Sequence, residues 1–219
     1  MSTPFYRERP AIGAPAGLLV LHHGRGADES DLLPLADLLD PDRRTHVVAP
    51  RAPLTLAGSP GYHWYVVPRV GAPDPGTFRA AYEALAALHN ELWERLQVPP
   101  ERTVLGGFSM GSVMSFALGL GPDRPAPAGI LAFSGFIPRV EGWQPDVVER
   151  RPRVLIAHGR RDPVIGVEFA RDARAQLEDG GIDVDYHEFD GGHTIDPGVL
   201  GNAATWLAET VGRSSAQAE

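Results

Sequence analysis

Residues 103–120 read TVLGGFSMGSVMSFALGL, and this stretch decides the fold because it joins two kinds of secondary structure at a serine. The apolar run 103–108 predicts a buried strand, and the apolar positions within 110–120 predict a helix. Between them stands Gly-x-Ser-x-Gly, centred on Ser109. A sharp strand-to-helix turn leaves no room for side chains at the glycine positions and lifts the serine hydroxyl clear of the sheet. This context favours a nucleophile over a glycine-rich turn with a capping serine.

Strands and helices alternate on both sides of this segment. Apolar runs predict strands over 17–22, 45–49, 103–108, 129–133 and 153–158, and residues 183–189 are predicted as a further strand. Apolar stripes at helical spacing predict helices over 28–39, 77–97, 110–120, 166–179 and 197–211. Residues 51–76, rich in Pro and Gly, indicate a structured loop. We therefore expect a single α/β domain over residues 1–219, with a mostly parallel sheet covered by helices on both faces.

Composition excludes several classes of function. The 219 residues carry a net charge of −8 and no basic run, which argues against nucleic acid and anionic membrane surfaces as partners. Without cysteine there are no disulfides, thiolate nucleophiles or Cys-ligated metals. All 20 basic side chains are arginines, so lysine-dependent phosphate loops, Schiff bases and Ser–Lys hydrolysis are excluded as well.

The amino-terminal residues, MSTPFYRERP, do not resemble a signal peptide, and no apolar run is long enough to cross a bilayer. We expect a cytoplasmic protein without stable membrane insertion.

A serine hydroxyl needs a neighbouring base, and in α/β-hydrolases the chain order is Ser, then Asp or Glu, then His. Asp162 follows the strand 153–158, and His193 follows the strand 183–189. Both positions lie at the carboxyl ends of predicted strands, where ligands bind in such sheets. We predict that His193 is the base and that Asp162 orients it.

Other histidines and aspartates have plainer interpretations. His158 ends a strand and is expected to be a packed, hydrogen-bonded residue. His187 alternates with apolar residues, as a surface position in a strand does. Asp190 lies close to His193 and suits a turn, and Asp196 suits the cap of the last helix.

The segment HHGRG, residues 22–26, follows the first buried strand. Neighbouring histidines on a strand face opposite sides, and no carboxylate cluster completes a metal site. We predict instead that the backbone N–H groups of Arg25 and Met110 form an oxyanion hole. The guanidinium of Arg25 is either solvated or a contact for an acidic group of the substrate.

The ordered segments LHHGRGAD, PRAP, GYHWY, GGFSMGSVMS, HGRRDPVI and GGHTI resemble the phospholipase/carboxylesterase family of small serine esterases, which includes acyl-protein thioesterases. This resemblance implies the α/β-hydrolase fold without a large cap domain. It also matches Ser109, Asp162 and His193 to a catalytic triad, and the amides of Arg25 and Met110 to an oxyanion hole. The chain departs from the family pattern at Met110, often glutamine, at Arg25, often apolar, and at Val66, often polar.

The expected activity is hydrolysis of a small carboxylic ester through an acyl-enzyme, with no metal and no organic cofactor. Trp64 and Tyr65 are expected to form a wall of the acyl pocket. A long-chain acyl thioesterase or lysophospholipase is the alternative among hydrolases. A non-catalytic small-molecule binding protein is the alternative from another class. Because dimers are common in the resembling family, a homodimer is expected.

Overall fold

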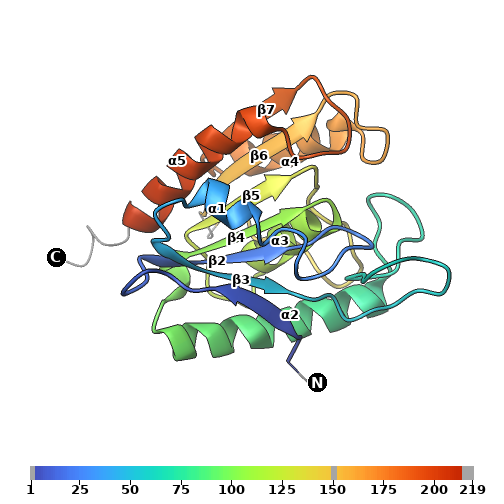
Figure 1. Cartoon of the computed structure of the whole chain (residues 1–219). Coiled ribbons are helices and arrows are strands. Elements are labelled where there is room, and N and C mark those ends of the chain that lie inside the picture. The colour runs from blue at the N-terminus through green and yellow to red at the C-terminus, as the bar shows by residue number, and fades with distance from the viewer. Residues whose placement is uncertain (1–2, 149–151, 214–219) are drawn as a thin grey trace.

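The computed structural model describes residues 3–148 and 152–213. Its seven-stranded sheet has the order β1-β3-β2-β4-β5-β6-β7 (Figure 1). The strands are β1 (Tyr6–Arg9), β2 (Gly17–His22), β3 (Thr45–Pro50), β4 (Thr103–Phe108), β5 (Gly129–Phe133), β6 (Arg153–Gly159) and β7 (Val184–Phe189). The helices are α1 (Leu35–Leu39), α2 (Pro75–Leu96), α3 (Met110–Gly119), α4 (Val167–Asp179) and α5 (Pro197–Arg213), and η1 (Pro100–Arg102) is a 3₁₀ turn.

Every strand pair is parallel except β1 with β3, which is antiparallel. The parallel strands point the same way in Figure 1, so their carboxyl ends share one edge of the sheet. The chain moves outward from β2 to β3 and then returns to place β4 on the other side of β2. Such a reversal opens a crevice beyond the carboxyl ends of the central strands. The loops after β2 and β4 therefore meet there.

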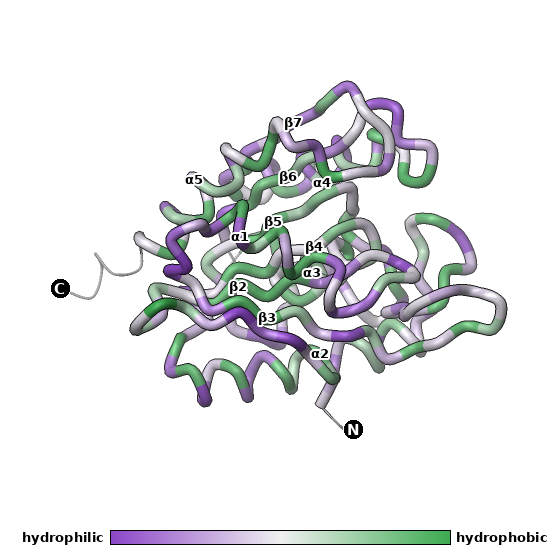
Figure 2. The backbone as a smooth tube through the Cα atoms, viewed as in Figure 1, coloured by the Kyte–Doolittle hydropathy of each residue, from purple (hydrophilic) through white to green (hydrophobic). Residues whose placement is uncertain are grey.

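Helices cover both faces of the sheet, which explains why the central strands are continuously apolar. In β2, Leu18 and Val20 pack with α2 and α3, whereas Leu19 and Leu21 pack with α1 and α5. Helix α4 covers β5 and β6 on the same side as α3. Figure 2 shows the hydrophobic strands between helices that turn their hydrophilic residues outward. The predicted α/β fold, a mostly parallel sheet with helices on both faces, is confirmed, and no large cap domain stands over the sheet in the described residues.

The element predictions fail in two places. The helix expected over 28–39 is only α1, Leu35–Leu39. The Asp28 carboxylate accepts a hydrogen bond from the Ser30 amide, and Pro34 has no N–H to donate, so the leucine spacing alone does not make a helix here. Strand β1 was not predicted because its sequence, YRER, is polar, as an edge strand can be.

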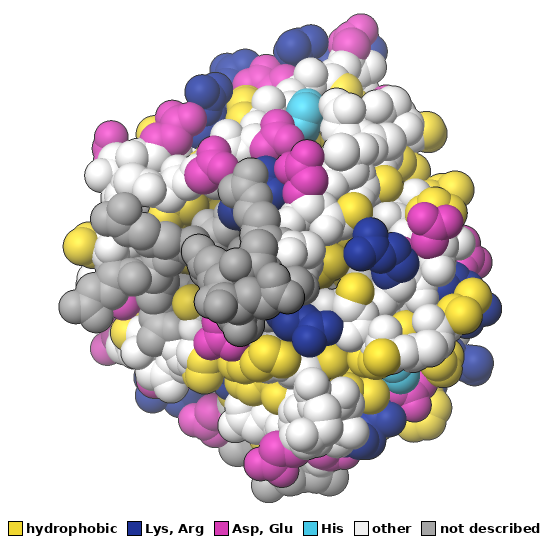
Figure 3. Space-filling view, turned by 90° about the vertical axis from the view of Figure 1, so that its left-hand side faces the viewer, with side chains coloured by type: hydrophobic (Ala, Val, Ile, Leu, Met, Phe, Trp, Pro, Cys, Tyr) yellow, Lys and Arg dark blue, Asp and Glu magenta, His cyan; other side chains and the backbone are white. Residues whose placement is uncertain are grey.

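Figure 3 looks onto the end of the molecule where the parallel strands begin, opposite the crevice. Acidic and arginine side chains lie close together on this face, with apolar side chains between them. Charges of both signs are therefore mixed there.

Candidate active site

Ser109 stands in the turn between β4 and α3 with φ 53° and ψ −118°. A non-glycine residue in such a conformation costs on the order of 1–3 kcal/mol and persists only where its surroundings hold it. The Ser109 amide donates to the Phe133 carbonyl at 2.9 Å, which ties the turn to β5. A Cβ atom at Gly107 would overlap the backbone of Gly111, and one at Gly111 would overlap the carbonyl of His22. The two glycines are thus required for the turn to form.

Three side chains from separate loops form one chain of hydrogen bonds. His193 Nε2 lies 2.8 Å from Ser109 Oγ, and His193 Nδ1 lies 2.7 Å from Asp162 Oδ2. The Phe108 ring packs against the His193 ring, with centroids 4.8 Å apart. Because a carboxylate accepts hydrogen bonds, Nδ1 carries the proton and Nε2 is free to accept the serine proton. The structure therefore brings together the three residues that the sequence selected.

Asp162 is held as a carboxylate. Its Oδ1 accepts hydrogen bonds from the amides of Val164 and Ile165 at 2.8 and 2.9 Å. Burial raises the pKa of Asp162, but the hydrogen bonds from Ile165, His193 and Val164 outweigh burial, and the net pKa is lowered. An ionised Asp162 can fix the orientation of His193 and stabilise its protonated form.

The two alternative bases are hydrogen-bonded or paired away from Ser109. His158 is buried; its Nε2 donates to the Ile165 carbonyl at 2.8 Å and lies 3.4 Å from Asp162 Oδ2, the oxygen that also contacts His193. Nε2 of His187 lies 2.8 Å from an Asp185 carboxylate oxygen.

The two other aspartates also have local roles. Asp190, with 70% of its side chain exposed, pairs with Arg161 at 3.0 Å. Asp196 accepts from the Gly198 amide at 2.7 Å, as a cap of α5 does.

The predicted oxyanion donors lie beside the serine. Arg25 and Met110 line the same cavity as Ser109. Within residues 3–148 and 152–213, neither amide donates a hydrogen bond to another residue. Met110 is the first residue of α3, so the positive end of that helix dipole is also directed at this position. Two N–H groups are thus available to a developing negative charge.

Trp64 holds the loop that carries Arg25. Its indole Nε1 donates to the His23 carbonyl at 2.9 Å, and its amide contacts Met110 Sδ at 3.3 Å. His23 Nδ1 donates to the Gly24 carbonyl at 2.7 Å, while His23 Nε2 accepts from the Ala52 amide at 3.0 Å. These bonds fix one neutral tautomer of His23, and burial lowers its pKa. The loop is therefore anchored at the carbonyls of His23 and Gly24.

A buried carboxylate, which was not predicted from the sequence, provides a second anchor for the loop that carries Arg25. Glu29, whose side chain is 3% exposed, accepts two hydrogen bonds from Arg51, at 2.6 and 2.7 Å. The Arg51 guanidinium lies between the rings of Phe5 and Tyr62, 4.7 and 4.6 Å from their centroids. The Gly26 amide donates to the Tyr62 carbonyl at 2.9 Å. Little in the sequence indicated this ion pair. Arg51 lies within the PRAP segment, but no local pattern links it to Glu29.

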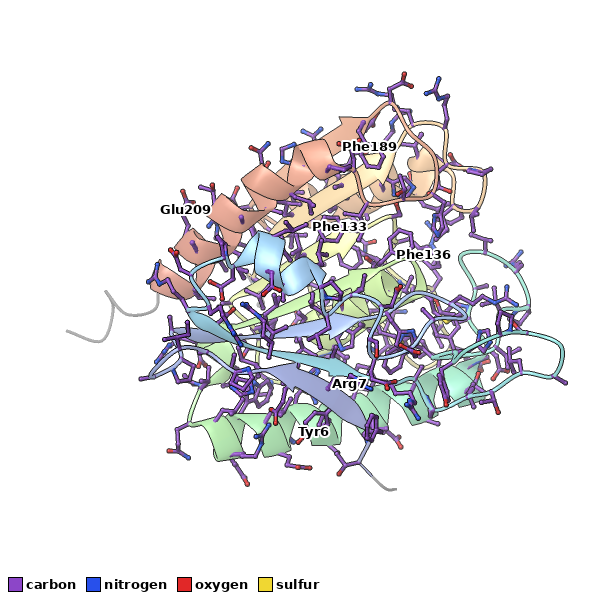
Figure 4. All side chains as sticks on the ribbon, viewed as in Figure 1. Tyr6, Arg7, Phe133, Phe136, Phe189 and Glu209 are labelled. Atoms are coloured by element: carbon purple, nitrogen blue, oxygen red, sulfur yellow. The ribbon has the colours of Figure 1, made fainter. Side chains whose placement is uncertain are left out.

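The cavity at Ser109 has a volume of about 80 Å³. Tyr65 lines it, but Trp64 does not, because Trp64 is completely buried behind the loop. Figure 4 shows Phe136, another lining residue, beyond the carboxyl ends of the strands. The remaining lining residues are Arg25, Val67, Arg69, Val70, Pro73, Met110, Val164 and Ile165.

A larger open depression of about 940 Å³ adjoins this cavity. Arg69, Val70 and Phe136 line both, and α4 forms the far wall of the depression through Phe169 and Asp172. A substrate bound at Ser109 can therefore extend toward α4.

Within residues 3–148 and 152–213, no helix combines the length and apolarity that a membrane span requires. In the same ranges, no group of three His, Cys, Asp or Glu side chains is arranged to hold a metal ion.

The chain is similar to known hydrolases along most of its length. The family model described as Phospholipase/Carboxylesterase matches residues 10–211. Acyl-protein thioesterase 1 homolog 1 of Dictyostelium discoideum is 22% identical, over 91% of this chain and 93% of that protein. The crystal structure of esterase PE8 is 33% identical, over 95% of this chain and 100% of that chain, with a TM-score of 0.83. Bacillus cereus carboxylesterase shares the fold, with a TM-score of 0.81 at 23% identity over 94% of this chain and 93% of that chain. The resemblance drawn from the sequence is confirmed.

Proposed function

The chain belongs to the phospholipase/carboxylesterase family, and we propose that within it the protein is a serine carboxylesterase that acts through an acyl-enzyme on Ser109. The observation that carries this proposal is the unbroken hydrogen-bond chain Ser109–His193–Asp162, with contacts of 2.8 and 2.7 Å. A serine in such a turn without a neighbouring base would be consistent only with ligand binding. Because His193 is in place as the base, an esterase is favoured over a non-catalytic binding protein.

The proposed reaction has two halves. Ser109 Oγ attacks the ester carbonyl carbon while His193 Nε2 takes the hydroxyl proton, and the amides of Arg25 and Met110 receive the negative oxygen. When the carbonyl re-forms, the bond to the alcohol oxygen breaks, and the alcohol leaves with the proton from His193. Water then attacks the acyl-enzyme in the same way, and its proton returns to Ser109 through His193. Ester and water give acid and alcohol.

The size of the cavity bears on the acyl chain. Its volume of about 80 Å³ is small beside the 940 Å³ of the open depression that it adjoins. This space suits a short acyl group, so we place short-chain esters ahead of long-chain lipids. Thioesters are the second candidate, because relatives such as the Dictyostelium protein are named acyl-protein thioesterases and the same steps cleave a thioester.

Hydrolysis of p-nitrophenyl esters of increasing acyl length tests the proposal. We expect the highest kcat/KM on acetyl to butyryl esters. Ser109→Ala should lose on the order of 10⁴–10⁶ in turnover while its circular dichroism stays that of the wild type. A Ser109→Ala protein that keeps a tenth of wild-type turnover would refute the assignment. Parallel assays with acyl thioesters of equal length rank the second candidate.

A further inference from the structure

The cavity at Ser109 carries positive charge. Arg25 and Arg69 line it, and none of its lining residues in the described part of the chain is acidic. Both arginines are exposed. Neither side chain makes an ion pair or hydrogen bond with a residue of 3–148 or 152–213. Two residues of this lining therefore carry guanidinium groups without a partner among the described residues.

The chain is acidic, with a net charge of −8, and many of its arginines pair with carboxylates. Arg9 pairs with Asp40 at 3.1 Å, Arg51 with Glu29 at 2.6 Å and Arg171 with Glu188 at 2.8 Å. Other arginines, among them Arg44 and Arg79, have no ion pair with the described residues, but they do not line the cavity at Ser109. The lining of the cavity is therefore positively charged and favours anions, whereas the depression beyond it carries both Arg139 and the acidic Asp172 and Asp179.

A third donor faces the same space. Tyr65 lines the cavity, and only 3% of the residue is exposed. Its hydroxyl makes no hydrogen bond with any residue of the described ranges. Burial raises the pKa of Tyr65, so the phenol keeps its proton and can donate. Guanidinium groups and a phenol together provide the donors that a carboxylate accepts.

We propose that the substrate is a small ester bearing a free carboxylate a few atoms from the scissile bond, and that Arg69, together with Arg25, binds this carboxylate. The inference rests on the proposed esterase function and specifies its substrate class. Arg69 lines both the cavity and the depression toward α4. The carboxylate can therefore belong to the acyl part, as in a dicarboxylic acid monoester, or to the alcohol part, as in an ester of a hydroxy acid.

Two matched pairs of esters distinguish a carboxylate on the acyl part from one on the alcohol part. Monoethyl succinate and ethyl levulinate differ only in that a methyl group replaces the carboxylate oxygen on the acyl side. Acetylglycolate and acetoxyacetone differ in the same way on the alcohol side. A pH-stat assay at pH 8 gives kcat/KM for each ester, and the ratio of anionic to neutral ester measures recognition of the carboxylate. We expect a ratio of about 5–20 in at least one pair, the range of charged hydrogen bonds at a partly exposed site.

The variant Arg69→Gln removes one charge while keeping a polar side chain of similar length. It should reduce the ratio about fivefold or more, mainly through KM of the anionic ester. Arg44→Gln is the matched control, because Arg44 is exposed and precedes β3 at the opposite end of the parallel sheet. Its ratio should equal that of the wild type. In the wild type, 0.5 M NaCl should lower the ratio, since salt screens exposed charges.

The two proposals fail in different ways. An enzyme that hydrolyses the neutral esters in a Ser109-dependent manner, but shows ratios of one or less in both pairs, contradicts only the carboxylate inference. A ratio above five that Arg69→Gln leaves unchanged also contradicts it. Hydrolysis that survives Ser109→Ala, or none of any ester by the wild type, contradicts the esterase function itself.

Discussion

The Nε2 atom of His193 lies 2.8 Å from the Oγ atom of Ser109, across 84 residues of sequence. If the two act as one unit, losing both should cost little more than losing one. We expect His193→Ala and Ser109→Ala each to lower turnover on a short-chain ester by about 10⁴–10⁶, and the double variant to match the more damaged single variant. Steady-state kinetics of the three variants measure this. Additive losses would show that the residues act independently.

The roles of Asp162 and Asp190 can be distinguished by replacing each of them with asparagine. Asp162→Asn should lower turnover by about 10⁴, because the amide favours the wrong tautomer of His193. Asp190→Asn should cost far less, since Asp190 is exposed and pairs with Arg161 rather than with His193. Turnover is measured on variants whose circular dichroism matches the wild type. A collapse of turnover in Asp190→Asn alone would transfer the acid role to Asp190.

The role of Arg25 in the oxyanion hole is assigned to its backbone. Arg25→Pro removes the N–H donor and should lower kcat on a neutral ester by about 10²–10³. Arg25→Ala keeps the donor and should lower kcat much less. The comparison is made on a neutral short-chain ester so that charge recognition does not contribute. Equal losses in the two variants would assign the catalytic role to the guanidinium instead.

Glu29 should make stability depend on pH. Hydrogen bonds from Arg51 lower the pKa of Glu29 to about 2, against 4.5 ordinarily. Because the folded-state pKa is the lower one, this stabilisation is complete above about pH 5 and is lost as the pH falls toward 2. A shift of this size corresponds to roughly 3 kcal/mol.

Glu29→Gln should therefore unfold more easily at pH 7 and lose less stability than the wild type between pH 6 and pH 3. Urea unfolding at these two pH values measures the difference. Asp42→Asn, at an exposed residue with no ion pair to the part of the chain described, serves as the control. An unchanged pH dependence in Glu29→Gln would show that the Glu29–Arg51 pair does not contribute.

Local sequence signals predicted much of the fold and the site. Strands β2 to β6 carry apolar runs, and the turn at Ser109 carries glycines that its close backbone contacts require. Asp162 and His193 could be selected because both follow strands, and parallel strands end at one edge.

Features that depend on distant partners could not be predicted. A tryptophan in a loop gives the same signal whether it lines a pocket or supports a loop, so Trp64 was expected in the acyl pocket and instead lies buried against His23. Glu29 and Arg51 are 22 residues apart, and only the folded chain shows that they pair. The region 28–34 forms turns in spite of its leucines, because the Asp28 carboxylate accepts from the Ser30 amide and Pro34 has no N–H to donate.

The most direct test of the account is the site at which a fluorophosphonate attaches to the intact protein. The reagent forms a stable ester with a serine that a neighbouring base activates. We predict one adduct per chain, placed on Ser109 by fragmentation of the tryptic peptide that begins at Thr103, and a large loss of labelling rate in His193→Ala. Labelling at another serine, or equal labelling of Ser109 with and without His193, would contradict the assignment of Ser109 as the activated nucleophile.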